Sequence, residues 1–171
     1  MKTFALFLIM LLSLVLESTL FRLPGLTIYA PNLVIIAVVM AGLLRSPSLA
    51  LVFGLCIGFI QDMNFGTFLG ETAFSYGLIG YLTGLVRSVF IRESIILGVL
   101  MTGIGVEIYY WVTYLLDDLL GEGVIRVQVM IKLSTDATIS SMICMVVLYF
   151  IYHRLFARKR VFSYSDESIN V

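Results

Sequence analysis

The chain has 171 residues, of which 60% are hydrophobic and only 13% are charged. A soluble domain carries about 25% charged residues, so this chain has more apolar surface than one core can bury, and lipid is the solvent that accommodates it. Eleven basic residues balance eleven acidic ones, which argues against nucleic acid as a partner.

Charges and helix breakers divide the chain into six apolar segments. Arg22, Pro24 and Gly25 end the first segment, and Pro31 and Asn32 open the second, since proline suits the first turn of a helix. The predicted fold is an all-α polytopic bundle of six transmembrane helices over residues 1–157, followed by a short cytoplasmic tail at 158–171. The predicted spans are about 3–21, 32–44, 47–60, 72–86, 94–116 and 133–156.

The connections between these segments are predicted from polar residues and glycines. Residues 45–47 form a tight turn, residues 61–70 a glycine-containing loop, and residues 117–131 a polar loop. The second and third spans are short, because about 14–16 helical residues reach only ~21–24 Å against ~30 Å of hydrocarbon. We therefore expect Gln61 and Asp62 to lie near the headgroups or in a shallow outward-facing cavity.

The distribution of basic residues predicts the orientation of the chain. One side of the membrane carries eight of them and the other side three. The eight are Lys2, Arg45, Arg87, Arg92, Arg154, Arg158, Lys159 and Arg160, and the three are Arg22, Arg126 and Lys132. Both termini are thus predicted to be cytoplasmic, which agrees with an even number of spans in the inner membrane.

Ionisable side chains inside the spans need an explanation, because each costs about 2.5–3.5 kcal/mol at the centre of a helix. Glu107 is the deepest, while Glu17 and Asp136 lie nearer to span ends. Glu17 and Glu107 are candidates for a buried polar site that binds a ligand or a proton. The favoured interpretation of Glu107 is a hydrogen-bonded carboxyl that fixes helix packing. Four aromatic residues after Glu107 are interpreted as an interfacial belt: Tyr109, Tyr110, Trp111 and Tyr114.

Small residues recur at helix-packing spacing in two spans. Gly54 and Gly58 form one Gly-x-x-x-Gly pair, and Gly80 and Gly84 form another. Such pairs let helix backbones approach closely in lipid. They predict that the third and fourth spans pack tightly together.

Side chains suited to metal binding or catalysis are sparse. Cys56 and Cys144 lie in apolar runs and are interpreted as small buried hydrophobic residues. The single histidine cannot form a metal cluster with them, and the sequence contains no phosphate-binding loop or nucleophile–base pattern. The sequence therefore predicts a protein that is not an enzyme and uses no cofactor or metal.

The order of several short motifs is more specific. The first helix ends in Leu-Glu-Ser-Thr-Leu at 16–20, and Pro-Asn-Leu at 31–33 opens the next. Gly54, Gly58, Gln61 and Asp62 then precede a loop with two glycines. Over roughly residues 5–90 this order resembles the bacterial rod shape-determining protein MreD family, and beyond that the length and span count agree. The family often has Gln where this chain has Glu17, and Pro-Asp where it has Pro-Asn at 31–32.

The resemblance implies a part in the cell-elongation machinery of rod-shaped bacteria and in peptidoglycan synthesis. It implies binding to an MreC-like single-span protein and, indirectly, association with MreB, a RodA-type glycosyltransferase and a class B penicillin-binding protein. It also implies a fold similar to the substrate-binding subunits of energy-coupling-factor (ECF) vitamin transporters, which have six helices and an outward-facing pocket.

Three functions are compatible with these features. In the first, the protein is a scaffold whose helix faces bind an MreC-like span, and Gln61 and Asp62 hold the following loop or touch a partner. In the second, it is a small-molecule-binding transporter subunit with a pocket near Gln61, Asp62, Glu71 and Glu107. In the third, it is a channel or proton-coupled carrier that uses Glu17 and Glu107, which would require discontinuous helices or polar stripes.

Overall fold

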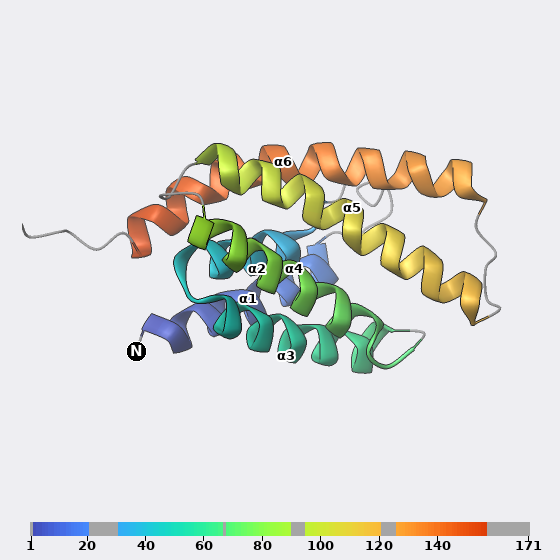
Figure 1. Cartoon of the computed structure of the whole chain (residues 1–171), viewed down its shortest axis with the longest axis horizontal. Coiled ribbons are helices and arrows are strands. Elements are labelled where there is room, and N and C mark those ends of the chain that lie inside the picture. The colour runs from blue at the N-terminus through green and yellow to red at the C-terminus, as the bar shows by residue number, and fades with distance from the viewer. Residues whose placement is uncertain (1, 21–30, 67, 90–94, 121–125, 157–171) are drawn as a thin grey trace, which may run out of the picture.

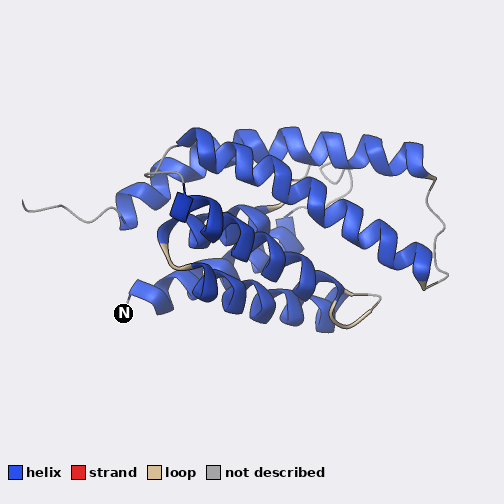
Figure 2. Ribbon diagram, viewed as in Figure 1, coloured by secondary structure: helices blue, strands red, loops and turns tan. Residues whose placement is uncertain are grey.

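The computed structural model describes residues 2–20, 31–66, 68–89, 95–120 and 126–156. Every element in these ranges is an α-helix (Figures 1 and 2), so the predicted all-α architecture of six helices is confirmed. The helices are α1 (Lys2–Leu20), α2 (Leu33–Leu44), α3 (Pro47–Phe65), α4 (Glu71–Val89), α5 (Ile95–Leu119) and α6 (Val127–Phe156).

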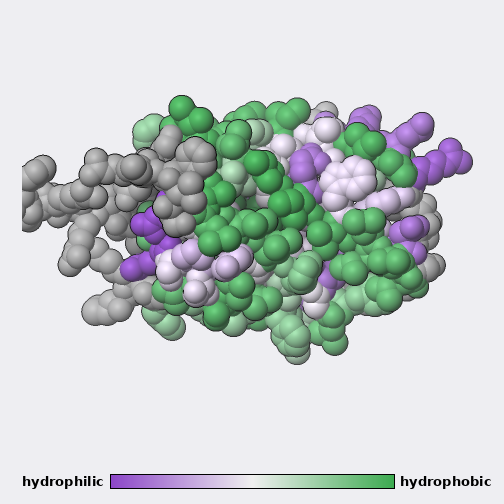
Figure 3. Space-filling model, viewed as in Figure 1, coloured by the Kyte–Doolittle hydropathy of each residue, from purple (hydrophilic) through white to green (hydrophobic). Residues whose placement is uncertain are grey.

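Three of the described helices are long and apolar enough to cross a membrane: Pro47–Asn64 in α3, Ile95–Leu119 in α5 and Val127–Phe150 in α6. The apolar parts of α1 and α2, Phe4–Thr19 and Leu33–Leu44, are shorter. The face seen in Figure 3 is hydrophobic across the body of the helices, and hydrophilic residues gather toward its ends. This protein is a membrane protein whose outer surface is matched to lipid.

Helix α2 forms the centre of the bundle. It packs against all five other helices, and every residue from 34 to 43 is buried. Its sequence is apolar on all sides, as expected of a helix that is enclosed by others. With 12 residues it is only about 18 Å long, so its ends lie within the bundle and depend on side chains of neighbouring helices for hydrogen bonds.

Helices α3 and α4 pack at backbone contact. A Cβ atom added at Gly54 or Gly58 would overlap the backbone of Tyr76 or Ala73 on α4. A Cβ atom at Gly80 would lie 2.6 Å from the carbonyl oxygen of Ala50 on α3. Gly84 packs in the same way against Pro47, at the first turn of α3. All four glycines of the two Gly-x-x-x-Gly pairs therefore face this one interface.

Helices α5 and α6 lie side by side along the upper edge of Figure 1 and pack against each other. The inner face of α6 consists of residues spaced three or four apart: Met130, Ser134, Ala137, Ser141 and Met145. With 30 residues, α6 is about 45 Å long and exceeds the ~30 Å of a hydrocarbon core.

Two of the predicted loops are too long, because helices extend into them. Residues 61–64 are helical, because α3 continues to Phe65, so α3 has 19 residues and is not a short helix. Helix α5 continues to Leu119 and α6 begins at Val127, so most of the predicted loop 117–131 is helical. In both places polar residues occupy the ends of long helices, where a charge pattern does not distinguish a helix end from a loop.

Two further interpretations are corrected by the packing. Cys56 is exposed and Cys144 is only partly buried, because Cys56 lies beside rather than on the glycine face of α3. Tyr109 is not part of an interfacial belt, since its ring lies 5.6 Å from that of the fully buried Tyr76. The breakers Arg22, Pro24 and Gly25, and the tail 158–171, lie outside the described residues.

Candidate functional site: carboxylates and polar groups between the helices

The carboxylate of Asp62, which is 4% exposed, caps the N-terminus of α4. Its Oδ2 accepts hydrogen bonds from the backbone N–H groups of Gly70 at 2.9 Å and Ala73 at 3.1 Å, and its Oδ1 accepts one from Thr72 at 3.0 Å. The positive end of the helix dipole and the negative carboxylate attract each other. Gly70 has a φ of +106°, which L side chains rarely adopt. The loop thus turns at Gly70 so that three donors converge on Asp62.

Gln61 connects α3 to α4 through a side-chain hydrogen bond. Its Oε1 accepts from the hydroxyl of Tyr76 at 3.1 Å. Tyr76 is completely buried, and its hydroxyl also lies near Asn32 and Glu17. Gln61 therefore belongs to a polar group in the middle of the bundle rather than to an exposed loop.

Glu17 on α1 serves the N-terminus of α2. Its Oε2 accepts a hydrogen bond from the backbone N–H of Val34 at 3.1 Å, and the N–H of Leu33 also lies against the carboxylate. The side chain of Asn32 accepts from the N–H of Ile35 at 3.0 Å. Together these acceptors satisfy the N–H groups that the first turn of a buried helix leaves without partners.

The same N-terminus is joined to α6. The hydroxyl of Ser141, which is fully buried, accepts a hydrogen bond from the backbone N–H of Asn32 at 2.9 Å. The hydrogen bonds of Glu17, Asn32 and Ser141 thus tie α1, α2 and α6 together at one point. Each bond replaces a contact with water that the first turn of an enclosed helix cannot make.

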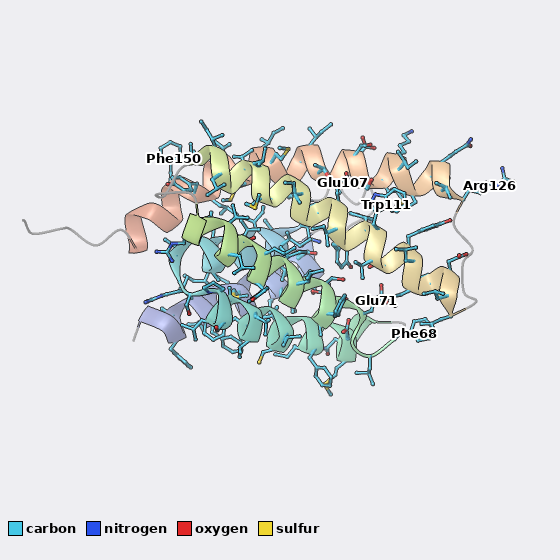
Figure 4. The ribbon with its side chains drawn as sticks, in the orientation of Figure 1. Phe68, Glu71, Glu107, Trp111, Arg126 and Phe150 are labelled. Atoms are coloured by element: carbon cyan, nitrogen blue, oxygen red, sulfur yellow. The ribbon has the colours of Figure 1, made fainter. Side chains whose placement is uncertain are left out.

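Glu107 lies apart from this group, between α5 and α6. Its Oε1 accepts a hydrogen bond from the hydroxyl of Thr138 at 2.9 Å. Glu107 and Thr138 line an open cavity of about 450 Å³ whose other lining residues are mostly apolar: Leu100, Gly103, Ile104, Ile108, Trp111 and Met142. Figure 4 shows Glu107 and Trp111 along the side of α5 that borders α6.

The four residues predicted for a transporter pocket are not brought to one cavity. Glu71 is buried in the first turn of α4 near Asp62 and Asp117. The cavity beside Glu107 is lined by none of Gln61, Asp62 and Glu71. Asp136 is half-buried on α6. Glu17 and Glu107 also form separate groups, each with its own hydrogen-bond partners.

Three polar partners were not predicted from the sequence: Tyr76, Thr138 and Ser141. Thr138 and Ser141 continue a stripe of small and polar residues on α6 that also includes Ser134 and Ala137. This spacing is the signal that would have identified the inner face of α6. No comparable signal marks Tyr76.

Comparison with known proteins places this architecture in a family. No match was found among curated proteins or among solved structures. The model of the family described as rod shape-determining protein MreD matches residues 1–159. Because that match covers most of the 171 residues, the chain belongs to the MreD family of rod shape-determining proteins.

Proposed function

We propose that the protein fulfils the role of its family in rod shape determination as a non-enzymatic scaffold of the cell-elongation complex in the inner membrane. Its helix faces bind the transmembrane span of an MreC-like protein, and through that partner it contributes to peptidoglycan synthesis together with MreB, a RodA-type glycosyltransferase and a class B penicillin-binding protein.

One observation carries this proposal: the polar side chains that chemistry or transport would need are used to hold helices together. Glu17, Gln61 and Asp62 each accept hydrogen bonds from another helix or from its first turn. What the described helices present to a partner is apolar surface, including Leu100, Ile104 and Val147. A protein of this construction acts by binding other membrane spans.

In this proposal all six helices cross the membrane and both termini are cytoplasmic. The shortest helix, α2, is accommodated because the other helices enclose it, so its length need not match the thickness of the bilayer. Asp62 and the loop after α3 then lie on the outer side, and the turn at Arg45 lies on the cytoplasmic side. The guanidinium of Arg87 donates a hydrogen bond to the carbonyl oxygen of Arg45 at 2.7 Å, which joins two basic residues of that side.

The proposal is tested by affinity purification of the tagged full-length chain from native membranes in mild detergent, with mass spectrometry of both proteins and small molecules. We expect an MreC-like single-span protein in about equal amount and no vitamin-like ligand. A matched control carries Asn64→Ala, which changes an exposed residue of α3 and should retain the partner. Recovery of paired ATPases or of a bound vitamin would instead identify a transporter subunit.

A further inference from the structure

The cavity between α5 and α6 contains a carboxylate with an unused acceptor. Thr138 has a single hydroxyl proton, which it donates to Oε1 of Glu107. Among the described residues, Thr138 bonds Oε1 of Glu107 and no hydrogen bond is made to Oε2. Oε2 is also not one of the buried polar atoms that lack a partner, so a group outside the chain can reach it. A carboxyl oxygen at membrane depth without a donor is costly, because lipid tails provide none. The side chain is therefore suited to accept a hydrogen bond from outside the chain.

The position of Glu107 along α5 restricts where that donor can come from. Glu107 is 12 residues from Ile95 and 12 residues from Leu119, the two ends of the helix, so about 18 Å of helix separates it from either end. Headgroups begin about 15 Å from the bilayer centre. With α5 centred across the bilayer, as in the proposed function, neither a headgroup amine nor an extramembrane domain reaches this depth, and a donor on another membrane-spanning segment fits the site.

The shape and chemistry of the surrounding surface fit such a segment. The cavity is open, about 450 Å³ in volume and otherwise mostly apolar. Leu100, Ile104 and Trp111 along its α5 side are 51%, 46% and 43% exposed. In Figure 3 a small hydrophilic area interrupts the hydrophobic face, consistent with the position of Glu107 in Figure 4.

We propose that this cavity is the docking site for a partner transmembrane helix that carries a hydrogen-bond donor near its midpoint. The donor is a serine, threonine, asparagine, glutamine, lysine or arginine side chain directed at Oε2 of Glu107, and apolar side chains of the same helix fill the cavity beside Ile104 and Trp111. The inference rests on the proposed function for the identity of the partner, which is the MreC-like span.

The site is tested by photo-crosslinking in intact membranes. A benzoylphenylalanine is placed at Ile104 or Trp111 in the full-length chain, in cells that contain a tagged MreC-like protein. Matched controls carry it at Val147 on α6 or at Val52 on α3, which are 60% and 49% exposed and do not line the cavity. We expect adducts with the span of the MreC-like protein at both cavity positions and none at the controls.

Two substitutions separate docking from helix packing. Glu107→Leu removes both acceptors, and we expect it to reduce the recovered partner roughly 3- to 20-fold, the range of one interhelical hydrogen bond in membranes. Thr102→Val changes a buried residue of the same helix whose hydroxyl donates to the carbonyl oxygen of Gly98 and which does not line the cavity, so partner recovery should stay within about twofold of wild type. Both variants are first shown to be monodisperse by size-exclusion chromatography with a melting temperature near that of the wild type.

The outcomes distinguish this inference from the proposed function. One outcome is that the wild type retains the MreC-like protein, but its span forms adducts at the control positions and not at the cavity positions. The docking site is then wrong and the proposed function stands. Adducts only with lipid, or only with a second copy of the chain, would likewise overturn it. If the cavity positions crosslink to the span of a different protein and no MreC-like protein is recovered, the docking site stands and the proposed function fails.

Discussion

Glu17 on α1 accepts a hydrogen bond from the backbone N–H of Val34 in the first turn of α2, at 3.1 Å. Asp62 on α3 serves the first turn of α4 in the same way. Each carboxylate lies three residues before the end of its own helix, at Leu20 and at Phe65. The α1–α2 and α3–α4 pairs are therefore joined in the same way. In each pair, a carboxylate near the end of the first helix neutralises the positive N-terminus of the second.

Glu17→Leu is expected to destabilise the bundle. It leaves the N–H of Val34 buried without its acceptor, which costs about 1–3 kcal/mol, and a fall in melting temperature measured in detergent would show the loss. Glu17→Gln keeps an acceptor oxygen in the same position and should stay close to wild type. Equal losses for Leu and Gln would mean that the negative charge, not the hydrogen bond, is what matters.

Asp62→Ala is expected to have a larger effect, because three donors lose one acceptor group. Charge-assisted hydrogen bonds contribute about 1.5–3 kcal/mol each when measured singly, and the three share one carboxylate, so we expect a total of roughly 3–5 kcal/mol. Protein abundance and rod shape should decline together in complemented cells. A stable Asp62→Ala protein at normal abundance that fails to support rod shape would instead assign Asp62 a direct contact with a partner.

The sequence predicts the order of helices well, because charges and breakers mark the ends of apolar segments. It predicts packing less well, because in lipid the outside of a helix is as apolar as the inside. On α1, Leu8 is 57% exposed and Leu6 is 1% exposed, although the two residues are identical. Hydrophobicity alone cannot tell them apart.

Polar and small residues carry the information that hydrophobicity lacks. Gly54 and Gly80 predict a close α3–α4 contact, and in the structure a Cβ atom at either glycine would overlap the backbone of the other helix. Glu107 was expected to fix helix packing, but its partner Thr138 lies 31 residues away. Their pairing depends on how α5 and α6 are aligned along each other, which follows from the whole interface and not from any local pattern.

Gly54→Ala is expected to disrupt the α3–α4 pair, because its new Cβ would overlap the backbone carbonyl of Tyr76. Backbone atoms of two helices cannot move independently, so the helices must separate at a cost of about 1–3 kcal/mol or more. Gly103→Ala is the matched control: its Cβ would meet only the flexible side-chain end of Met142 at 3.0 Å. The melting temperatures of the two purified variants are compared with that of the wild type. A fall for Gly103→Ala as large as the fall for Gly54→Ala would contradict this interpretation.

The proposed orientation is tested with single cysteines in a chain whose Cys56 and Cys144 are replaced by alanine. Ser46→Cys and Asn64→Cys change exposed residues at opposite ends of α3, and the side chain of Ser46 makes no capping hydrogen bond. Because basic residues are concentrated on the side of Arg45, that side should be cytoplasmic. A membrane-impermeant maleimide added outside spheroplasts should label Asn64→Cys at once and Ser46→Cys only after lysis. Labelling in the opposite order would invert the topology and place the Asp62 loop in the cytoplasm.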